Sequence, residues 1–248
     1  MKTEEVCNVI CTSNHLIAYL DLLGCKKSII NEEDNEILLK IYEWYNFFKC
    51  EARFRRLYEP ERKVKIFSDN IIVAEEINFK RFDDDQIRKI CESFLRMIRT
   101  FQFVLMTCGW YVRGSVEVGS LYIDETFVWG KSLITAYMLE SQKAIYPRVL
   151  ISDNFAQEIS VCIDDLIDKK FIALDSDGQI YVDYFNFEGD DGGRFPVLLE
   201  QIRNSIMWSY QKSNHDARVQ KKIQWVIEKF NQECLRSDRE SYLIRDII

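Results

Sequence analysis

The sequence predicts one α/β (α+β) domain, and three observations support this prediction. Short apolar runs alternate with longer segments whose apolar residues recur at helical spacing, in the order β-α-β-β-α-β-α-β. Two pairs of short runs are joined by tight turns, and such hairpins argue against a purely parallel, doubly wound sheet. The chain has 248 residues, of which 47% are hydrophobic, and this is enough for one large core.

The first half of the chain contains three expected strands and two expected helices. Residues 15–20 form an apolar run that ends at Asp21, which is typical of a buried strand. Residues 35–58 carry apolar side chains at helical spacing and precede Pro60, so they predict a long helix. Residues 63–74 predict two strands around a Ser-Asp-Asn turn. A run of three aspartates at 83–85 predicts the start of the next helix, which extends to about residue 103.

The second half continues with a strand, a helix, a hairpin and two further helices. A strand region is expected over residues 108–123, and a helix over 130–145 that Pro147 terminates. A short strand follows at 149–151, and the segments 171–174 and 180–184 flank a hairpin turn. The last two helices are expected at roughly 193–211 and 214–236.

Composition excludes several classes of protein. The net charge of −7 argues against a nucleic-acid partner, because phosphate neutralisation supplies most of the affinity of such proteins. No apolar run approaches the roughly 20 residues that span a membrane, and the N-terminus carries charges that do not suit a signal peptide. The eight cysteines form no Cys-x-x-Cys pair, which disfavours a structural zinc site. We therefore expect a cytoplasmic protein with reduced thiols and no membrane contact.

Two aspartates are the candidates for chemistry. Asp21 ends a buried strand, where a carboxylate is costly unless it is paired or binds a cation. Asp69 occupies the tight turn between the next two strands. If these strands are neighbours, both carboxylates lie at one edge of the sheet and suit a pair of magnesium ions. The alternative is that Asp69 only forms the turn.

Four segments resemble the motifs of class III adenylate and guanylate cyclases. Tyr19-Leu20-Asp21-Leu22-Leu23-Gly24 is similar to their first metal motif, and Lys65-Ile66-Phe67-Ser68-Asp69 to their second. The strand from Arg113 to Gly119 resembles their Arg-x-Gly-x-x-x-Gly strand, with the middle glycine shifted to Gly114. Trp129-Gly130-Lys131-Ser132-Leu133 resembles the start of their Trp-Gly helix. The resemblance implies a single cyclase-like domain with a mixed, mostly antiparallel sheet flanked by helices.

The resemblance also implies roles for individual residues. Asp21, Asp69 and the backbone carbonyl of Leu22 would hold two divalent ions, Mn²⁺ or Mg²⁺. Arg113 would contact the triphosphate, because its planar fork suits phosphate oxygens; the alternative is a cross-strand salt bridge. Lys65 would lie near the base; the alternative is an outward-facing strand lysine.

One departure from the class III pattern points to a narrower group. The positions that match the transition-state Asn and Arg of these cyclases are Ile134 and Met138, and neither donates a hydrogen bond. Lys131, Thr135, Tyr137 and Arg148 are the candidates to replace them. The strings Ala136-Tyr137-Met138-Leu139-Glu140 and Tyr146-Pro147-Arg148, with the last helix from Lys221 to Ile227, resemble pyrimidine cyclases of the bacterial Pycsar anti-phage systems.

That narrower resemblance implies a homodimeric enzyme with its sites at the subunit interface. It converts UTP to cyclic UMP and pyrophosphate, with CTP as the alternative substrate, and residues 1–190 form the catalytic domain. Residues 191–248 are expected as a C-terminal helical extension on the same domain, and Tyr137 with Lys65 as the base-binding residues. A catalytically inactive nucleotide-binding module is the third alternative. The aromatic residues Trp44, Tyr45 and Phe48 would narrow the base site or simply fill the core, and residues 189–193 are expected to form a solvated loop.

Overall fold

The computed structural model of the chain describes residues 10–24, 61–186 and 195–245, together with the single residues 39, 42, 43 and 46. Trp44, Tyr45, Phe48 and the segment 189–193 lie outside these residues, as does most of the helix expected over 35–58. No helix in the described part of the chain is long and apolar enough to cross a bilayer.

One mixed sheet organises the described residues. Its strands are β1 (Ser13–Leu23), β2 (Arg62–Phe67), β3 (Asn70–Glu76), β4 (Tyr111–Ile123), β5 (Val128–Trp129), β6 (Val149–Ile151), β7 (Ile172–Leu174) and β8 (Ile180–Val182). Their order is β2-β3-β1-β4-β6-β8-β7, and β5 pairs with β4. The β4–β6 pair is parallel and the other described pairs are antiparallel. The prediction of an α/β fold with a mixed, mostly antiparallel sheet is therefore confirmed.

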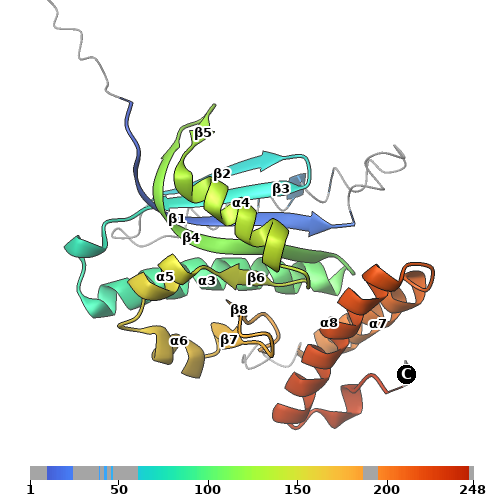
Figure 1. Cartoon of the computed structure of the whole chain (residues 1–248). Helices are drawn as coiled ribbons and strands as arrows, with labels where there is room; N and C mark the ends of the chain where they lie inside the picture. Colours follow the sequence, from blue (N-terminus) through green and yellow to red (C-terminus); the bar gives the residue numbers. More distant parts are fainter. Residues whose placement is uncertain are drawn as a thin grey trace, which may run out of the picture.

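Helices cover both faces of the sheet, and the last helices of the chain lie at one end of it. They are α3 (Asp84–Thr107), α4 (Lys131–Lys143), α5 (Asp153–Glu158), α6 (Ile163–Asp168), α7 (Phe195–Lys212) and α8 (Ala217–Arg236), with short 3-10 turns at Phe79–Arg81 and Glu240–Tyr242. Figure 1 shows α4 crossing the strands on one side and α3 running along the other, while α7 and α8 lie together at one end. The sequence analysis did not predict α5, α6 and β5, which are all short.

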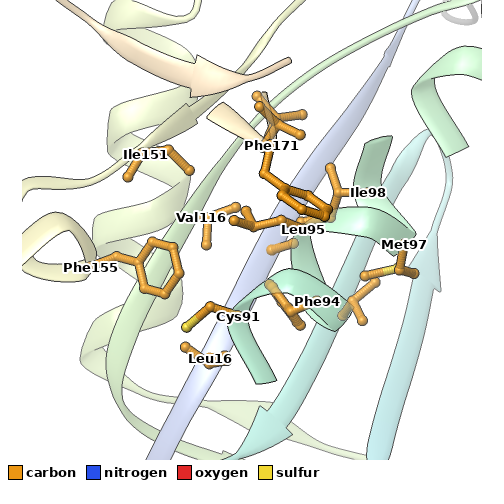
Figure 2. Close-up of a cluster of buried hydrophobic side chains, with 14 of the residues drawn as sticks. Leu16, Cys91, Phe94, Leu95, Met97, Ile98, Val116, Ile151, Phe155 and Phe171 are labelled. Carbon is orange, nitrogen blue, oxygen red and sulfur yellow. The ribbon is translucent and has the colours of Figure 1, made fainter. Parts of the chain in front are cut away.

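Helix α3 forms because its sequence provides both an N-terminal cap and one apolar face. The side chain of Asp83 accepts a hydrogen bond from the backbone of Gln86, and the Gln86 side chain accepts one from the backbone of Asp83. Buried residues then recur every three or four positions along the helix, as an amphipathic helix requires. These residues pack against the strands in the main core. Figure 2 shows part of this core and labels Leu16, Cys91, Phe94, Leu95, Met97, Ile98, Val116, Ile151, Phe155 and Phe171.

A second core attaches α7 and α8 to the sheet. It combines residues of these helices with side chains from the sheet and from the end of α3, including Met106, Tyr111, Leu150, Leu199, Ile202, Ile206, Val226 and Phe230. Beside it lies Arg148, whose side chain is fully buried and ion-paired with Asp175 and Asp177 of the β7–β8 turn. Asp175 also accepts hydrogen bonds from Trp225 and Lys229 of α8, both at 2.9 Å. Removal of one partner from such a buried pair typically costs about 3–5 kcal/mol, so this network fixes α8 to the body.

Candidate functional site

The pairing of β1 with its two neighbours brings the predicted carboxylates together. Asp21 lies opposite Asn70 of β3 and opposite Arg113 of β4. Asp69 precedes Asn70 in the two-residue turn between β2 and β3, and its backbone carbonyl accepts a hydrogen bond from the Leu22 amide at 3.0 Å. Asp21 and Asp69 therefore lie at the same end of adjacent strands, as the sequence analysis expected.

The backbone of Leu22 faces the same turn. The N–H and C=O groups of one residue in an antiparallel strand point to the same neighbouring strand. Because the Leu22 amide binds the Asp69 carbonyl, the Leu22 carbonyl also points toward the β2–β3 turn. Two carboxylates and one carbonyl thus approach one edge of the sheet.

The turn itself is strained. Ser68 has a φ of 56°, in the left-handed region that favours glycine and costs another residue roughly 1–2 kcal/mol. Strain of this kind clusters at functional sites, where the surrounding structure enforces it. Here the strained residue directly precedes Asp69, so the turn is held in a geometry that presents this carboxylate.

Arg113 lies directly opposite Asp21, and the two strands approach closely beside this pair. A Cβ atom on the neighbouring Gly114 would lie 2.3 Å from the Tyr19 carbonyl oxygen, so only glycine fits there. The Nε atom of Arg113 donates a hydrogen bond of 2.8 Å to the Asp21 carboxylate. This is the cross-strand salt bridge that the sequence analysis held as the alternative for Arg113. The Arg113 side chain is 27% exposed and the Asp21 side chain 15% exposed, so the pair remains accessible to a ligand.

A third carboxylate, that of Glu140, enters the site from helix α4. Its Oε1 atom lies 2.7 Å from the Nε atom of Arg113, and the Glu140 side chain is only 3% exposed. Two hydrogen bonds hold α4 against β4: Ser115 Oγ donates to the Ala136 carbonyl at 2.7 Å, and Ser132 Oγ donates to the Ser120 carbonyl at 2.8 Å. Gly130 permits this approach, because a Cβ atom there would lie 2.4 Å from the Ser120 carbonyl.

The pKa of Tyr19 reflects the acidic side chains that lie near it. Burial, followed by the negative charges of Glu140 and Asp21, raises the pKa of Tyr19 to about 12. Its hydroxyl therefore stays protonated and donates a hydrogen bond of 2.5 Å to the Asn70 side chain. The Tyr19 ring meets Tyr137 of α4 edge to face, with ring centroids 5.7 Å apart. Tyr137, a predicted base-binding residue, therefore lies beside the carboxylate cluster.

Lys222 of α8 contributes a second cation. Burial lowers its pKa, the positive charge of Arg113 lowers it further, and Asp21 and Glu140 act in the opposite direction. Lys222 lies one turn before Trp225, which holds α8 to Asp175, so this face of α8 points to the body. Glu140 and Lys222 had no role in the sequence analysis. The signal for Glu140 was an acid at a buried helical position beside the Tyr137 motif, whereas no local signal marked Lys222.

The remaining candidates lie farther from this cluster. Lys65 is on the same face of the sheet, but its ammonium group binds the backbone carbonyl of Glu125 in the turn before β5. The prediction that Arg148 replaces the missing transition-state arginine is wrong, because Arg148 is buried in ion pairs with Asp175 and Asp177. Lys131 is exposed at the start of α4, and its backbone carbonyl accepts a hydrogen bond from the Thr135 hydroxyl.

The residues present fit a divalent cation. Among the described residues no group of three or more His, Cys, Asp and Glu side chains forms a complete ligand set. Magnesium usually binds through one or two carboxylates together with substrate phosphates rather than in an all-protein cage. Asp21, Asp69 and the Leu22 carbonyl are the oxygen donors that would hold a cation in such a site, with the substrate completing the coordination.

Comparisons with known proteins identify similar folds. Family models give no match to the sequence, and a search of curated proteins gives none either. Among solved structures, the adenylyl cyclase CyaB from P. aeruginosa is similar with a TM-score of 0.43 and 16% identity, over 69% of this chain and 93% of that one. The catalytic core of a rhodopsin-guanylyl cyclase with converted specificity, in complex with ATPαS, gives 0.40 and 17%, over 68% and 94%. A bacterial light-regulated adenylyl cyclase gives 0.40 and 12%, over 77% and 98%. At these values the similarity does not establish a family for this chain.

The buried carboxyl group of Glu140 predicts a pH dependence of stability. Burial raises its pKa from 4.5 to about 7, against the attraction of Arg113. The folded state therefore binds its proton more tightly than the unfolded state, and the free energy of unfolding falls as pH rises through this window. We expect Glu140→Gln to remove up to about 3 kcal/mol of this fall.

Urea unfolding of the metal-free protein in EDTA, at pH 5 and at pH 8, measures this effect. The variant should gain stability relative to the natural protein at pH 8 and not at pH 5. An equal difference between the two proteins at both pH values would contradict the assignment.

Proposed function

We propose that the protein is a nucleotidyl cyclase that converts UTP to 3′,5′-cyclic UMP and pyrophosphate. The observation that carries the proposal is the convergence of Asp21, Asp69 and Arg113 at one end of adjacent strands. These three residues lie at the matching positions of the class III cyclase motifs to which the sequence is similar. The solved structures with similar folds are adenylyl and guanylyl cyclases.

The proposed mechanism assigns a task to each of these residues. Asp21, Asp69 and the Leu22 carbonyl would hold two divalent ions, Mn²⁺ or Mg²⁺, which would lower the pKa of the ribose 3′-hydroxyl and neutralise triphosphate charge. Arg113 would turn its remaining N–H groups to phosphate oxygens, for which its planar fork is suited. The 3′-oxygen would lose its proton to water and attack the α-phosphate in line as the bond to the pyrophosphate leaving group breaks, and positioning with charge neutralisation would supply most of the catalysis.

The pyrimidine specificity rests on the residues of α4. Ile134 and Met138 replace the hydrogen-bonding pair of the purine cyclases, and both are exposed. Tyr137 and Lys65 are proposed to contact the base, with Tyr137 held in position against Tyr19. UTP and CTP differ at one exocyclic group, so cytidylate cyclase activity is the second candidate. By the same resemblance, the cyclic nucleotide serves as an anti-phage messenger in the cytoplasm.

The exposed apolar residues of α4 support a homodimer. Ile134 and Met138 lie one helical turn apart and are exposed on α4, and Tyr137 between them is half-exposed beside Tyr19. Phe67, at the end of β2, is also exposed and lies beside the turn that carries Asp69. Contact with a second copy of the chain would cover these side chains and place the two sites at the subunit interface.

The catalytically inactive alternative makes a different prediction. The loss of the Asn and Arg pair at Ile134 and Met138 favours it, while the pair of carboxylates argues against it. An inactive module would show metal- and nucleotide-dependent thermal stabilisation without any cyclic product.

Incubation of the purified protein with each of four labelled nucleoside triphosphates and Mn²⁺ tests the proposed reaction. We expect cyclic UMP as the main product and a loss of at least about a hundredfold in Asp69→Asn, because the substitution removes a metal-binding charge. The matched control is Asp83→Asn, which changes a turn aspartate to a residue that still caps α3. No cyclic product from any triphosphate would overturn the proposal, and full activity of Asp69→Asn would remove this residue from the site.

The dimer makes a separate prediction. A glutamate at position 134 would bury a charge in the interface, so Ile134→Glu should raise the dimer dissociation constant at least about tenfold. Sedimentation equilibrium measures this constant. Leu174→Glu, at an equally exposed apolar residue on the opposite sheet edge, is the control and should leave the constant unchanged. A monomeric natural protein, or equal effects of both substitutions, would contradict this interface.

A further inference from the structure

Two carboxylates compete for one N–H group of Arg113. The Nε atom lies 2.8 Å from Oδ2 of Asp21 and 2.7 Å from Oε1 of Glu140. It carries a single hydrogen, which is directed to Asp21. Oε1 of Glu140 is buried and accepts no hydrogen bond from any described residue. A buried, unsatisfied acceptor of this kind requires an explanation.

A cation on Asp21 changes this competition. A divalent ion bound by the Asp21 carboxylate repels the positively charged guanidinium of Arg113. It also binds the carboxylate that otherwise accepts the Arg113 hydrogen bond. The Nε–H group of Arg113 then needs a new acceptor, and Oε1 of Glu140 is already at hydrogen-bonding distance. A small rotation of the guanidinium transfers the hydrogen bond without removing Arg113 from the site.

The position of Glu140 is set by contacts of its own helix. That helix is fixed to β4 by the hydrogen bonds of Ser115 and Ser132, which involve neither Asp21 nor Asp69. The Glu140 side chain is nearly inaccessible to solvent, so water does not take the place of its carboxylate as the acceptor of the Arg113 hydrogen bond. Lys222 adds a positive charge nearby, which favours the ionised form of Glu140.

We propose that Glu140 is a positioning residue that accepts the Arg113 hydrogen bond when a divalent cation occupies Asp21, and so keeps Arg113 directed at the triphosphate. The inference rests on the proposed cation and nucleotide site and adds a residue that positions Arg113 within it. Glu140 acts through Arg113 and contacts neither the cation nor the substrate. In its absence, Arg113 remains bound to Asp21 and opposes cation binding.

The test is a Mn²⁺ titration of the purified full chain at pH 8 without nucleotide, with the melting temperature as the readout. The proteins are the natural chain, Glu140→Gln, Arg113→Met and the double variant. We expect Glu140→Gln to raise the Mn²⁺ concentration for half-maximal stabilisation about tenfold, because a neutral amide oxygen accepts the Arg113 hydrogen bond more weakly than a carboxylate does. In the Arg113→Met background the same substitution should change it less than about twofold, because the competing arginine is gone.

Two further variants separate positioning from a structural role. Glu75→Gln changes another buried acid that pairs with an arginine, Arg62, at 2.6 Å; Glu75 lies on β3 opposite Leu16, five residues from the level of Asp21. It should leave the Mn²⁺ dependence unchanged. Glu140→Asp keeps the charge and should raise the Mn²⁺ requirement less than Glu140→Gln does; it also serves if the glutamine variant fails to fold.

The outcomes distinguish this inference from the proposed function. An unchanged Mn²⁺ requirement in Glu140→Gln, or an equal change with and without Arg113, would overturn the positioning role even if the natural protein makes cyclic UMP. A Glu140 effect that depends on Arg113, in a protein that makes no cyclic nucleotide, would support the positioning role and reject the cyclase. Absence of any stabilisation by Mn²⁺ would overturn the positioning role, whereas the cyclase is decided separately by the assay with labelled triphosphates.

Discussion

The register of β1 between β3 and β4 determines the position of the central ion pair of the candidate site, Asp21 and Arg113. It places Asp21 opposite Asn70 on one side and opposite Arg113 on the other. The close approach at Gly114 makes this arrangement available, because a side chain there would collide with the backbone of β1. A shift of one residue would turn Asp21 to the other face of the sheet, where α3 packs. The site is therefore a consequence of strand pairing and not of any single loop.

The charges in the site are balanced only in part. Asp21, Asp69 and Glu140 face two cations, Arg113 and Lys222, and two of the acids compete for the same guanidinium nitrogen. The acids outnumber the cations, and this excess of negative charge favours an incoming cation. Helix α8 is distant in sequence but also contributes to the site. The buried Arg148–Asp175–Trp225 contacts hold this helix in a position where the charge of Lys222 interacts with the acids.

Local patterns in the sequence predicted most of the fold. The hairpin around Asp69, the helix after Trp129 and the late hairpin follow from apolar periodicity and turn residues, which act over a few positions. Strand order and the contacts of α4 with β1 depend on pairing across many residues, so Glu140 was not recognised. Arg148 was one of four candidates to replace the missing transition-state pair, but its partners at 175 and 177 lie 27 and 29 residues away and bury it. The resemblance of the Tyr146-Pro147-Arg148 string did not reveal whether this arginine faces the site or the core.

The central claim is that Asp21, Asp69 and Arg113 form one site for a divalent cation and a nucleoside triphosphate. A crystal structure with Mn²⁺ and a non-hydrolysable UTP analogue tests it most directly, because the anomalous signal locates the ion without assumptions about the ligand. The account predicts Mn²⁺ in contact with the carboxylates of both Asp21 and Asp69, and the Arg113 guanidinium on a phosphate oxygen. Mn²⁺ bound elsewhere, or a triphosphate bound away from the β2–β3 turn, would contradict it.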